Sequence, residues 1–482
     1  MTKTISWDSG LEVVADGRGL VANAGLVLTR KTADMSGLTS GLGACYAQGR
    51  SDKLDRGVVL VGAAGMIAGG ARTICQAEAM ASSHTETFGP GASDTTLWRC
   101  LCETTEPVMT RIARVRAKAR RRVWGWLSGR QSGFPWVKAG GKQLTGWVVV
   151  DLDATLVDAY SDKEGAAGTF KGGYGHHPLG AWCANTGEAL VLMLRAGNAG
   201  SNTAGDHTHV LDQVFAQVPW PHRSRMLVRI DGAGASHETI DDLLKRGSAR
   251  RTVLFTCGWA ITADDEHAIA ALPEGIWEPY LDQAGRVPMV ERDGHLVPYG
   301  GVAELTGLDT RLGNWSKTLR LIARRVPVTP RDKDLTVLEK ATGWRYHISA
   351  TNIPPAGLAA VPGSTHPQWI DALHRQHAIV EDRVRTGKAT GLGHLPSKLW
   401  AVNAAWLVAA AIGVDLDAWC RLLGFEGTPL ENAEPATMRA RVWNSPARLA
   451  RHARKRWLRF ERTNPTSAFI ACAWDKIVAL PP

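Results

Sequence analysis

The chain has 482 residues, 44% of them hydrophobic, and a formal net charge of +10. This length exceeds that of one ordinary domain and supplies apolar material for real cores, so we expect two to four domains. The eight cysteines are scattered without a CxxC pair, which argues against a zinc ribbon or a disulfide framework and indicates a reducing compartment. The start lacks a signal-peptide pattern and the apolar stretches fall short of a bilayer span, so we expect a cytoplasmic protein with no membrane partner.

The basic residues gather at the end of a helical N-terminal region, residues 1–140, and near the carboxyl end of the chain. A helix predicted over residues 111–126 has one apolar face, and cations occupy much of the rest: Arg111, Arg114, Arg116, Lys118, Arg120, Arg121 and Arg122. Residues 426–482 are predicted to form a basic helical tail with a second cluster at 448–459. Clusters this dense favour contacts with a phosphate backbone over a solvated helix face. We therefore predict DNA contacts from these residues: Arg114, Lys118, Arg121, Arg451, Arg454 and Lys455.

Residues 141–258 show strands alternating with helices, which implies a partly parallel sheet. Five strands are predicted, the first three as a meander: 147–157, 177–183, 189–195, 226–230 and 252–256. Helices are predicted at 208–218 and 238–245, and Ser236 precedes the second as an N-cap.

A β-rich insertion is predicted over residues 259–355, where short alternating runs are broken by Pro, Gly and Asp turns. Residues 356–425 then contain two long helices, at 367–388 and 397–423. The expected class is therefore α/β, with a sheet domain interrupted by the insertion, a helical N-terminal region and a helical tail.

Three carboxylates occupy positions that suit a catalytic site. Asp151 and Asp153 share one face of a valine-rich strand, because side chains alternate with period two. Asp231 follows the apolar run 226–230, at the carboxyl end of a strand, where α/β proteins place their sites. Glu381 lies on the helix at 367–388. Taken alone, each acid has an ordinary explanation: a solvated strand edge, a turn cap or an exposed helix pair.

A polar stripe on the predicted helix strengthens the catalytic interpretation. At about 100° per residue, His374, His377, Glu381 and Lys388 fall within roughly 60° of one another. Three of these side chains can donate to phosphate. Two aspartates on strands, a later glutamate and nearby donors form the set that two magnesium ions need for in-line displacement at phosphorus.

These residues resemble those of the DDE transposases of bacterial insertion sequences, in particular the group numbered thirteen-eighty, related to the wider group with a Tyr-Arg-Glu-Lys signature. The resemblance covers nearly the whole chain and is carried by four segments: Phe88-Gly-Pro-Gly-Ala-Ser-Asp-Thr-Thr-Leu-Trp98, Asp151-Leu-Asp-Ala-Thr155, Glu164-Gly-Ala-Ala and Lys171-Gly-Gly-Tyr-Gly-His-His-Pro178. It implies an RNase H-like catalytic domain.

By this resemblance Asp153, Asp231 and Glu381 are the three catalytic acids and hold two Mg²⁺ ions, for which Mn²⁺ may substitute. Asp151 is the alternative for the first acid and a further metal ligand. The wider group carries Tyr-x2-Arg-x3-Glu-x6-Lys around the last acid; here the half from Glu381 to Lys388 matches, while His374 and His377 replace Tyr and Arg.

Further DNA contacts follow from the same resemblance. Arg375 and Arg383 are nearby substitutes for the missing signature residues, beside His374, His377 and Lys388. Some relatives use a tryptophan of the insertion to hold a flipped base, and Trp277, Trp315 and Trp344 lie in the matching region. Base stacking suits such side chains, although a core position is the ordinary role for any one of them.

Other chemistries find little support in the sequence. His176-His177 and His207-Thr-His209 lack Cys or acidic partners at zinc spacing, which favours ordinary or DNA-proximal histidines. Gly232-Ala-Gly234 lacks the third glycine of a dinucleotide loop, so no nucleotide cofactor is expected.

We therefore expect a nucleoid-associated, cut-and-paste transposase that works as a homodimer on double-stranded DNA, cutting at terminal inverted repeats and joining the 3′-hydroxyls to target DNA. The alternatives are a metal-dependent nuclease of the same fold without strand transfer and a catalytically inactive DNA-binding relative.

Overall fold

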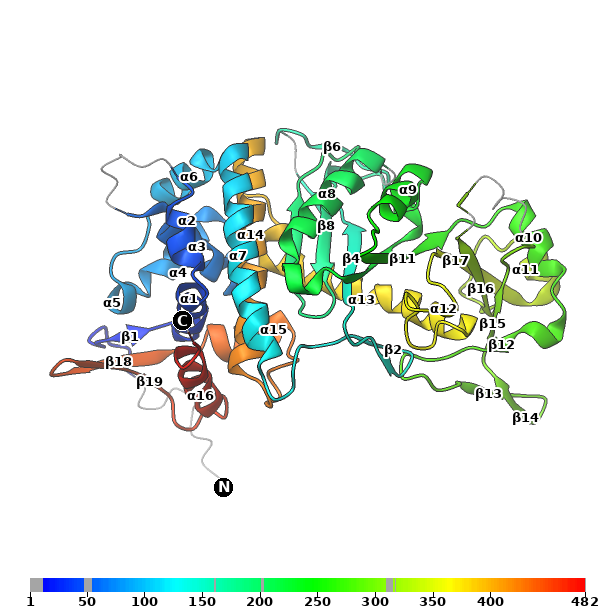
Figure 1. The fold of residues 1–482 in the computed structure, drawn as a ribbon. Coiled ribbons are helices and arrows are strands. Elements are labelled where there is room, and N and C mark those ends of the chain that lie inside the picture. The colour runs from blue at the N-terminus through cyan, green and yellow to red at the C-terminus, as the bar shows by residue number, and fades with distance from the viewer. Residues whose placement is uncertain are drawn as a thin grey trace, which may run out of the picture.

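A nine-stranded sheet forms the centre of the protein in a computed structural model (Figure 1), which describes residues 12–46, 54–159, 162–200, 203–308, 315–316 and 318–481. Its strand order is β12-β15-β16-β17-β11-β10-β4-β8-β9. The strand bounds are β4 Val148–Ala154, β8 Leu179–Cys183, β9 Ala189–Met193, β10 Arg225–Ile230, β11 Thr252–Trp259, β12 Glu278–Pro279, β15 Gly301–Glu304, β16 Arg320–Pro327 and β17 Trp344–Thr351. Strand β10 runs parallel to β4 and β11, and the other neighbours are antiparallel.

The five strands predicted in residues 141–258 are confirmed, including the antiparallel meander β4-β8-β9. Helices α8, Ala204–Gln217, and α9, His237–Lys245, also form as predicted, and the hydroxyl of Ser236 accepts from the backbone of Thr239 at the start of α9. Apolar residues occupy consecutive positions at the start of β4, and they are buried on both faces of the sheet, Val148 and Val150 on one and Val149 on the other. The continuous valine run is therefore the mark of a strand covered on two sides.

Two layers of helices cover the sheet. Val148 and Val150 belong to the same apolar cluster as Val210 of α8, whereas Val149 packs with Trp369 of α12, Pro367–Arg375. Since side chains alternate along a strand, Asp151 and Asp153 share the α12 side with Val149.

The predicted insertion does not form a separate β domain. Strands β12, β15, β16 and β17 continue the central sheet, because β17 pairs with β11 in antiparallel register from Thr256 opposite Thr351. A small separate hairpin, β13 Met289–Arg292 and β14 His295–Pro298, and the helices α10 Ala263–Ala270 and α11 Val337–Thr342 complete the region. Residues 259–355 are thus rich in strands, and most of these strands extend the central sheet.

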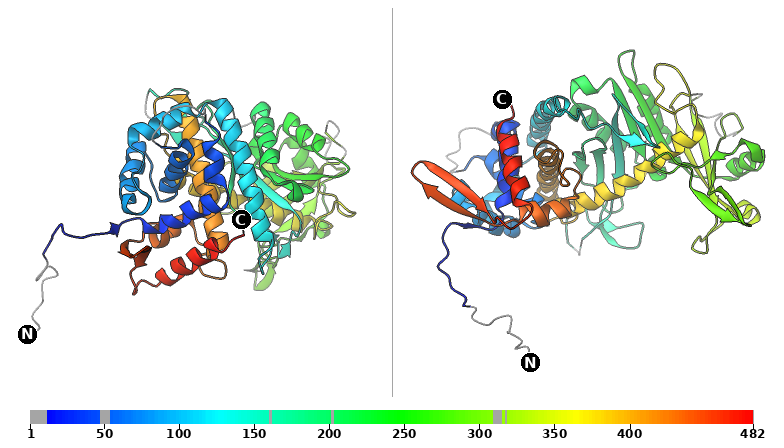
Figure 2. Two further views of the ribbon diagram at one scale, coloured as in Figure 1. Left: turned by 60° about the vertical axis from the view of Figure 1, so that its left-hand side comes forward. Right: turned by 90° about the horizontal axis from the view of Figure 1, so that it is seen from below.

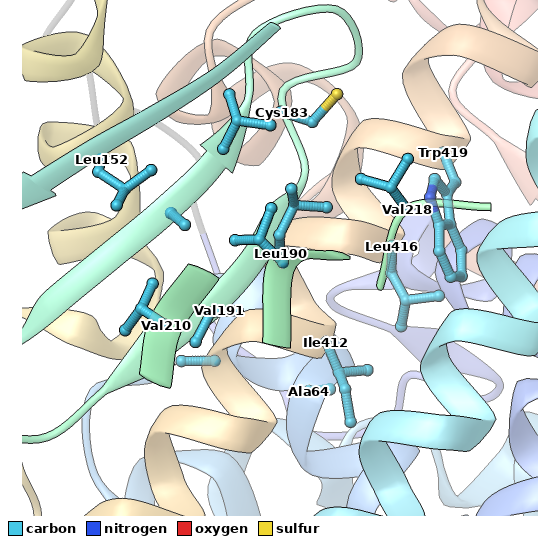
Figure 3. Packing of buried hydrophobic residues seen from close by; sticks show 14 of the residues in the cluster. Ala64, Leu152, Cys183, Leu190, Val191, Val210, Val218, Ile412, Leu416 and Trp419 are labelled. Carbon is cyan, nitrogen blue, oxygen red and sulfur yellow. The ribbon is translucent and has the colours of Figure 1, made fainter. Parts of the chain in front are cut away.

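The described residues of the N-terminal region are mainly helical. The helices are α1 Val27–Met35, α2 Leu38–Gly43, α3 Arg56–Ala68, α4 Ile74–Ser82, α5 Thr85–Phe88, α6 Asp94–Glu103 and α7 Glu106–Ser128. They gather around α14, Trp400–Gly424, which also packs on β9 (Figures 1 and 2). Helix α14 is long and apolar enough to cross a bilayer, but 83% of its most apolar stretch is buried inside the protein. Figure 3 shows Ile412 and Leu416 of this helix packing toward Leu190 and Val191 of the sheet.

The basic cluster of the tail, at residues 448–459, lies in a hairpin and not in a helix. Strands β18, Ala447–His452, and β19, Lys455–Phe460, pair in antiparallel fashion, with β1, Leu20–Val21, on the outer side of β18. Short helical segments flank the hairpin: α15 Pro435–Met438 before it and α16 Ser467–Val478 after it. The apolar residues at 447, 449, 458 and 460 recur with period two, which is a strand signal that the high density of arginine masks.

Candidate active site

Asp153 and Asp231 leave two neighbouring parallel strands side by side. Ile230 of β10 pairs with Leu152 of β4, so the next residue on each strand is one of these aspartates. Burial and the neighbouring charge of Asp231 raise the pKa of Asp153 to about 6. Within the described residues, neither carboxylate has an ion-pair partner. Two adjacent carboxylates without a cation repel each other, and a bound positive charge would stabilise both.

The loop after β10 fixes Asp231 at the end of its strand. Its Oδ1 accepts from the backbone N of Gly234 at 3.0 Å and caps a 3₁₀ turn, Gly232–Gly234. Gly258 of β11 lies so close that a Cβ there would come within 2.6 Å of the backbone N of Gly232. Any side chain at position 258 would therefore collide with the backbone of the Asp231 loop.

Asp151 has a different environment from Asp153. It is fully buried, and both its oxygens accept from Arg229, at 2.6 and 2.8 Å, while Oδ1 also contacts Nδ1 of His377 at 3.1 Å. Burial alone would raise its pKa, but Arg229 and His377 hold the pKa at about 2. The prediction of Asp151 as a metal ligand or first acid is therefore corrected, because both its oxygens already accept hydrogen bonds from Arg229 and His377 inside the protein.

The helix predicted over residues 367–388 is interrupted. It consists of α12, a 3₁₀ turn at Gln376–Ala378 and α13, Ile379–Gly387. His377 lies in the turn and binds Asp151, while His374 contacts the hydroxyl of Thr256 on β11 at 3.1 Å. Burial and the charge of His377 lower the pKa of His374 to about 3. Both histidines anchor the helix to the sheet, which corrects their prediction as phosphate donors.

Glu381 is exposed in the first turn of α13 and adds to the electrostatic rise in the pKa of Asp153. Arg375 is held by Asp371, at 2.7 Å, and by the hydroxyl of Tyr280, at 3.0 Å, so its prediction as a DNA contact is also corrected. Burial lowers the pKa of Arg383. Lys388, at the end of the same segment, is exposed.

A small cavity of about 140 Å³ opens at these carboxylates. It is lined by Leu152, Asp153, Ala154, Phe170, His177, Leu179, His207, Ile230 and Asp231. The Nδ1 atoms of His177 and His207 contact the backbone oxygens of Ala199, at 2.9 Å, and Thr203, at 3.2 Å. Burial lowers the pKa of both histidines, so neutral rings border the acids. The sequence singled out both histidine pairs but gave no reason to place one member of each at the site.

Carboxylate oxygens are the ligands that Mg²⁺ prefers, and the unpaired Asp153 and Asp231 suit such an ion. In the described part of the chain, no three His, Cys, Asp or Glu side chains stand close enough to hold a metal ion together. Two of the three predicted acids are thus adjacent, whereas Glu381 does not complete a closed ligand shell.

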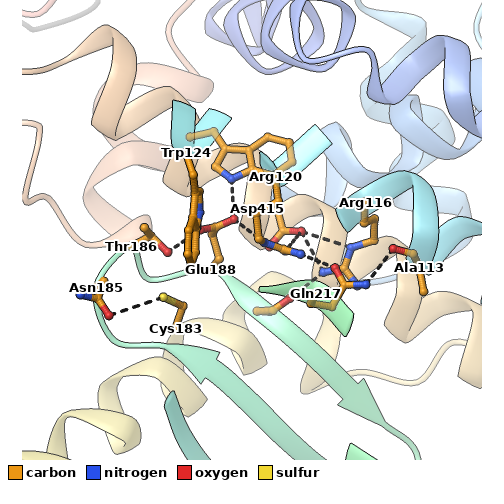
Figure 4. A network of polar contacts seen from close by, with 12 residues as sticks. Ala113, Arg116, Arg120, Trp124, Cys183, Asn185, Thr186, Glu188, Gln217 and Asp415 are labelled. Atoms are coloured by element: carbon orange, nitrogen blue, oxygen red, sulfur yellow. Dashed lines mark hydrogen bonds and ion pairs between the residues drawn. The ribbon is translucent and has the colours of Figure 1, made fainter. Parts of the chain in front are cut away.

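The basic face predicted on α7 divides into two sets. Arg114, Lys118 and Arg121 are exposed as predicted. Arg116 and Arg120 are buried among acids (Figure 4), so the cationic surface of α7 is narrower than its sequence indicates.

The buried pair belongs to a network that joins α7 to the sheet and to α14. Arg120 donates to Glu188 at 2.7 Å and to Asp415 at 2.7 Å, and Arg116 donates to Asp415 at 2.8 Å. Glu188 also accepts from the indole nitrogens of two buried tryptophans, Trp124 and Trp419, at 2.7 Å each.

The three tryptophans predicted as candidates to hold a flipped base contact other side chains of this chain. The guanidinium of Arg325 lies 4.4 Å from the ring of Trp277 and 4.7 Å from that of Trp344. Trp315 stacks on His237, the first residue of α9, with ring centroids 3.4 Å apart. Of the three, Trp315 is therefore the one that contacts α9, the helix that follows the Asp231 loop.

Comparison with known proteins places this site in a family. The family model described as Transposase DDE domain group 1 matches residues 4–482. No curated protein matches the sequence. Among solved structures, the chain is similar to a piggyBac transposase in a cryo-EM synaptic complex with hairpin DNA, with 10% identity, 95% of this chain and 85% of that chain covered, and a TM-score of 0.41. That likeness is distant and transfers no residue role. Since the family model spans nearly the whole chain, the protein belongs to the family Transposase DDE domain group 1 and is a DDE-type DNA transposase.

Proposed function

We propose that this transposase cuts phosphodiester bonds at the ends of an insertion sequence and joins the freed 3′-hydroxyls to target DNA, using Asp153, Asp231 and Glu381. The observation that carries the proposal is the pair of adjacent, unpaired aspartates at the carboxyl ends of β4 and β10. A bound cation would relieve their mutual repulsion.

Asp153 and Asp231 would hold Mg²⁺, or Mn²⁺ in its place, and Glu381 would complete the site from α13. The bound ions would activate the attacking water or 3′-hydroxyl and stabilise the leaving oxygen. The protein itself supplies the placement: β4 and β10 fix the two aspartates, and the contacts of His374 and His377 hold the helix that carries Glu381 against the sheet.

The strand order supports an RNase H-like identity for the central part of the sheet. The run β9-β8-β4-β10-β11 has an antiparallel meander followed by two parallel strands, with the first acid on its middle strand. In this interpretation β12, β15, β16 and β17 are an extension of that sheet.

DNA would contact the exposed cations of α7, Arg114, Lys118 and Arg121, and the basic hairpin at the carboxyl end. Two element ends must be held together for cut-and-paste transfer, so we infer a homodimer that acts on terminal inverted repeats in the cytoplasm, at the nucleoid. Lys388 and Arg383 both follow Glu381 in the chain, and the exposed Lys388 would meet the same strand, whereas Arg383 is only half-exposed.

The test incubates the purified protein with labelled DNA from the flank of its gene, a target plasmid and Mg²⁺. We expect cut and joined products that Asp231→Ala and Glu381→Gln abolish. Matched controls are Asp241→Ala, an exposed acid on α9, and Asp382→Asn, the neighbour of Glu381 on α13. Both controls should retain activity.

The alternatives give different products. Cutting without joining would identify a nuclease of the same fold. Binding without either reaction would identify an inactive relative. The structural reason would be that Glu381 does not join Asp153 and Asp231 in one group of metal ligands. Activity that survives Asp231→Ala would refute the assignment of the site.

A further inference from the structure

The hairpin of β18 and β19 carries an unusual concentration of positive charge. Residues 447–460 contain six arginine and lysine residues and no acid: Arg448, Arg451, Arg454, Lys455, Arg456 and Arg459. All six side chains are exposed. The hairpin projects from the end of the helical body opposite the insertion strands (Figures 1 and 2).

The strand register places like charges opposite one another. Arg448 pairs with Arg459 and Arg451 with Arg456, whereas Lys455 pairs with the formally neutral His452. Opposite residues of an antiparallel pair have Cβ atoms about 5 Å apart, and like charges there destabilise the pair. Such an arrangement gains free energy when a polyanion binds.

The two faces of the hairpin differ in their partners. The inward face begins with Ala447 and Leu449, which pack with Val21 and Ala24. Farther along this face, Arg451 lies 3.4 Å from a carboxylate oxygen of Glu86, and Arg456 donates to the backbone oxygen of Thr87 at 3.1 Å. The inward cations are thus braced against α5 and its surroundings, which changes the interpretation of Arg451 as a free DNA contact.

The outward face makes no such contacts with the described part of the chain. By alternation it consists of Arg448, Ala450, His452, Lys455, Trp457 and Arg459. Trp457, 38% exposed, lies between the pair Arg448–Arg459 and the pair His452–Lys455, and its ring lies 6.4 Å from that of His452.

Protection of an exposed sheet edge is the ordinary role of cations on an edge strand. It accounts for charges on β19, whose outer edge has no strand partner among the described residues. It does not account for the arginines of β18 opposite Arg456 and Arg459, or for the exposed Trp457 beside them.

We propose that the outward face of this hairpin enters the major groove of duplex DNA as a two-stranded ribbon. The proposal rests on the proposed DNA-transposing function and assigns the hairpin a mode of binding. Six-residue strands span about 20 Å, and the groove, about 12 Å wide, admits a two-stranded ribbon. Arg448, Lys455 and Arg459 would meet phosphates on its two walls, and Trp457 would face the base edges.

The test measures binding to a fluorescent mixed-sequence duplex between about 50 and 200 mM salt, without divalent metal. Arg448→Ala with Arg459→Ala should lower the slope of log affinity against log salt by about 1.8, and weaken binding by about tenfold or more near 0.1 M salt. Arg451→Ala with Arg456→Ala removes the same charge from the inward face and should change the slope much less. Arg448→Lys with Arg459→Lys should restore the slope.

Equal slope changes in the two alanine pairs, or none in either, would overturn the proposal. The groove is tested by dimethyl sulfate protection of guanine N7, which lies in the major groove. We expect protection that the outward alanine pair loses, and unprotected guanines in the wild-type complex would refute the groove assignment. Because these readouts need no cutting, inactivity at Asp231 leaves them unaffected, and failure of the hairpin test leaves the proposed chemistry intact.

Discussion

Glu188 is the side chain whose loss should destabilise the fold most directly. It is fully buried and accepts from Arg120, Trp124 and Trp419 (Figure 4). In Glu188→Gln the shape is kept, but the four-charge network with Arg116, Arg120 and Asp415 gains a net positive charge. In addition, the new amide hydrogens face N–H donors that had an acceptor before. Removing one partner of a buried ion pair costs about 3–5 kcal/mol, a large share of a typical stability of about 5–15 kcal/mol.

The assay is guanidinium unfolding followed by tryptophan fluorescence and by circular dichroism. Both probes are needed because a chain of this size need not unfold in two states. We expect an earlier transition in the tryptophan signal, since the amide of Gln has only one acceptor oxygen and either Trp124 or Trp419 loses its acceptor. The matched control is Glu434→Gln, whose pair with Arg385 is exposed and is worth at most about 1 kcal/mol.

A loss below about 1 kcal/mol in Glu188→Gln would refute this reasoning, because it would show that water reaches the network. A second variant, Glu188→Gln with Arg120→Met, removes the uncompensated charge. It should recover part of the loss, as apolar replacements of buried pairs commonly do.

The remaining predictions concern the site, its supporting loop and the acid limb of stability. Asp151→Asn leaves the buried Arg229 without an anion and should lower the free energy of unfolding by about 3–5 kcal/mol. Asp153→Asn should fold normally but lose DNA cutting. An Asp151→Asn protein as stable as wild type would contradict the assignment of Asp151 as the counter-ion of Arg229. Gly258→Ala should displace the Asp231 loop and reduce DNA cutting more than stability. The control is Gly205→Ala in α8, where a new Cβ meets nothing within 4 Å. Equal activity of the two variants would contradict the close contact between residue 258 and the backbone of Gly232. Burial lowers the pKa of His84 to about 4, so the unfolded state binds the proton first and stability should fall between pH 6.5 and 4 by up to about 3 kcal/mol. His84→Leu should remove that part of the pH dependence in thermal melts at several pH values, and an unchanged acid limb would show that His84 is not the group.

Much of the sheet could be predicted from the sequence because its strands are continuous apolar runs between turn signals. The run from Val148 to Val150 and the run from Met226 to Val228 are buried on both faces, and such runs are read correctly without tertiary information. The insertion strands were expected, but their pairing with β11 depends on contacts between residues distant in sequence, which periodicity does not encode. The hairpin at the carboxyl end was mistaken for a helix because charge density hid a period-two apolar pattern.

The choice between Asp151 and Asp153 shows what the sequence held and what it lacked. Both aspartates lie on one face of one strand, so spacing alone treats them as equivalents. The distinguishing signal was Arg229, a cation inside the otherwise apolar run of β10, because a buried charge requires a partner. In the parallel register of β4 and β10, Arg229 falls opposite Asp151, and the same register brings Asp231 beside Asp153. The pairing of β4 with β10 therefore forms the buried ion pair of Asp151 and Arg229. Two residues farther along each strand, toward the carboxyl ends, it brings together Asp153 and Asp231, which have no cation among the described residues.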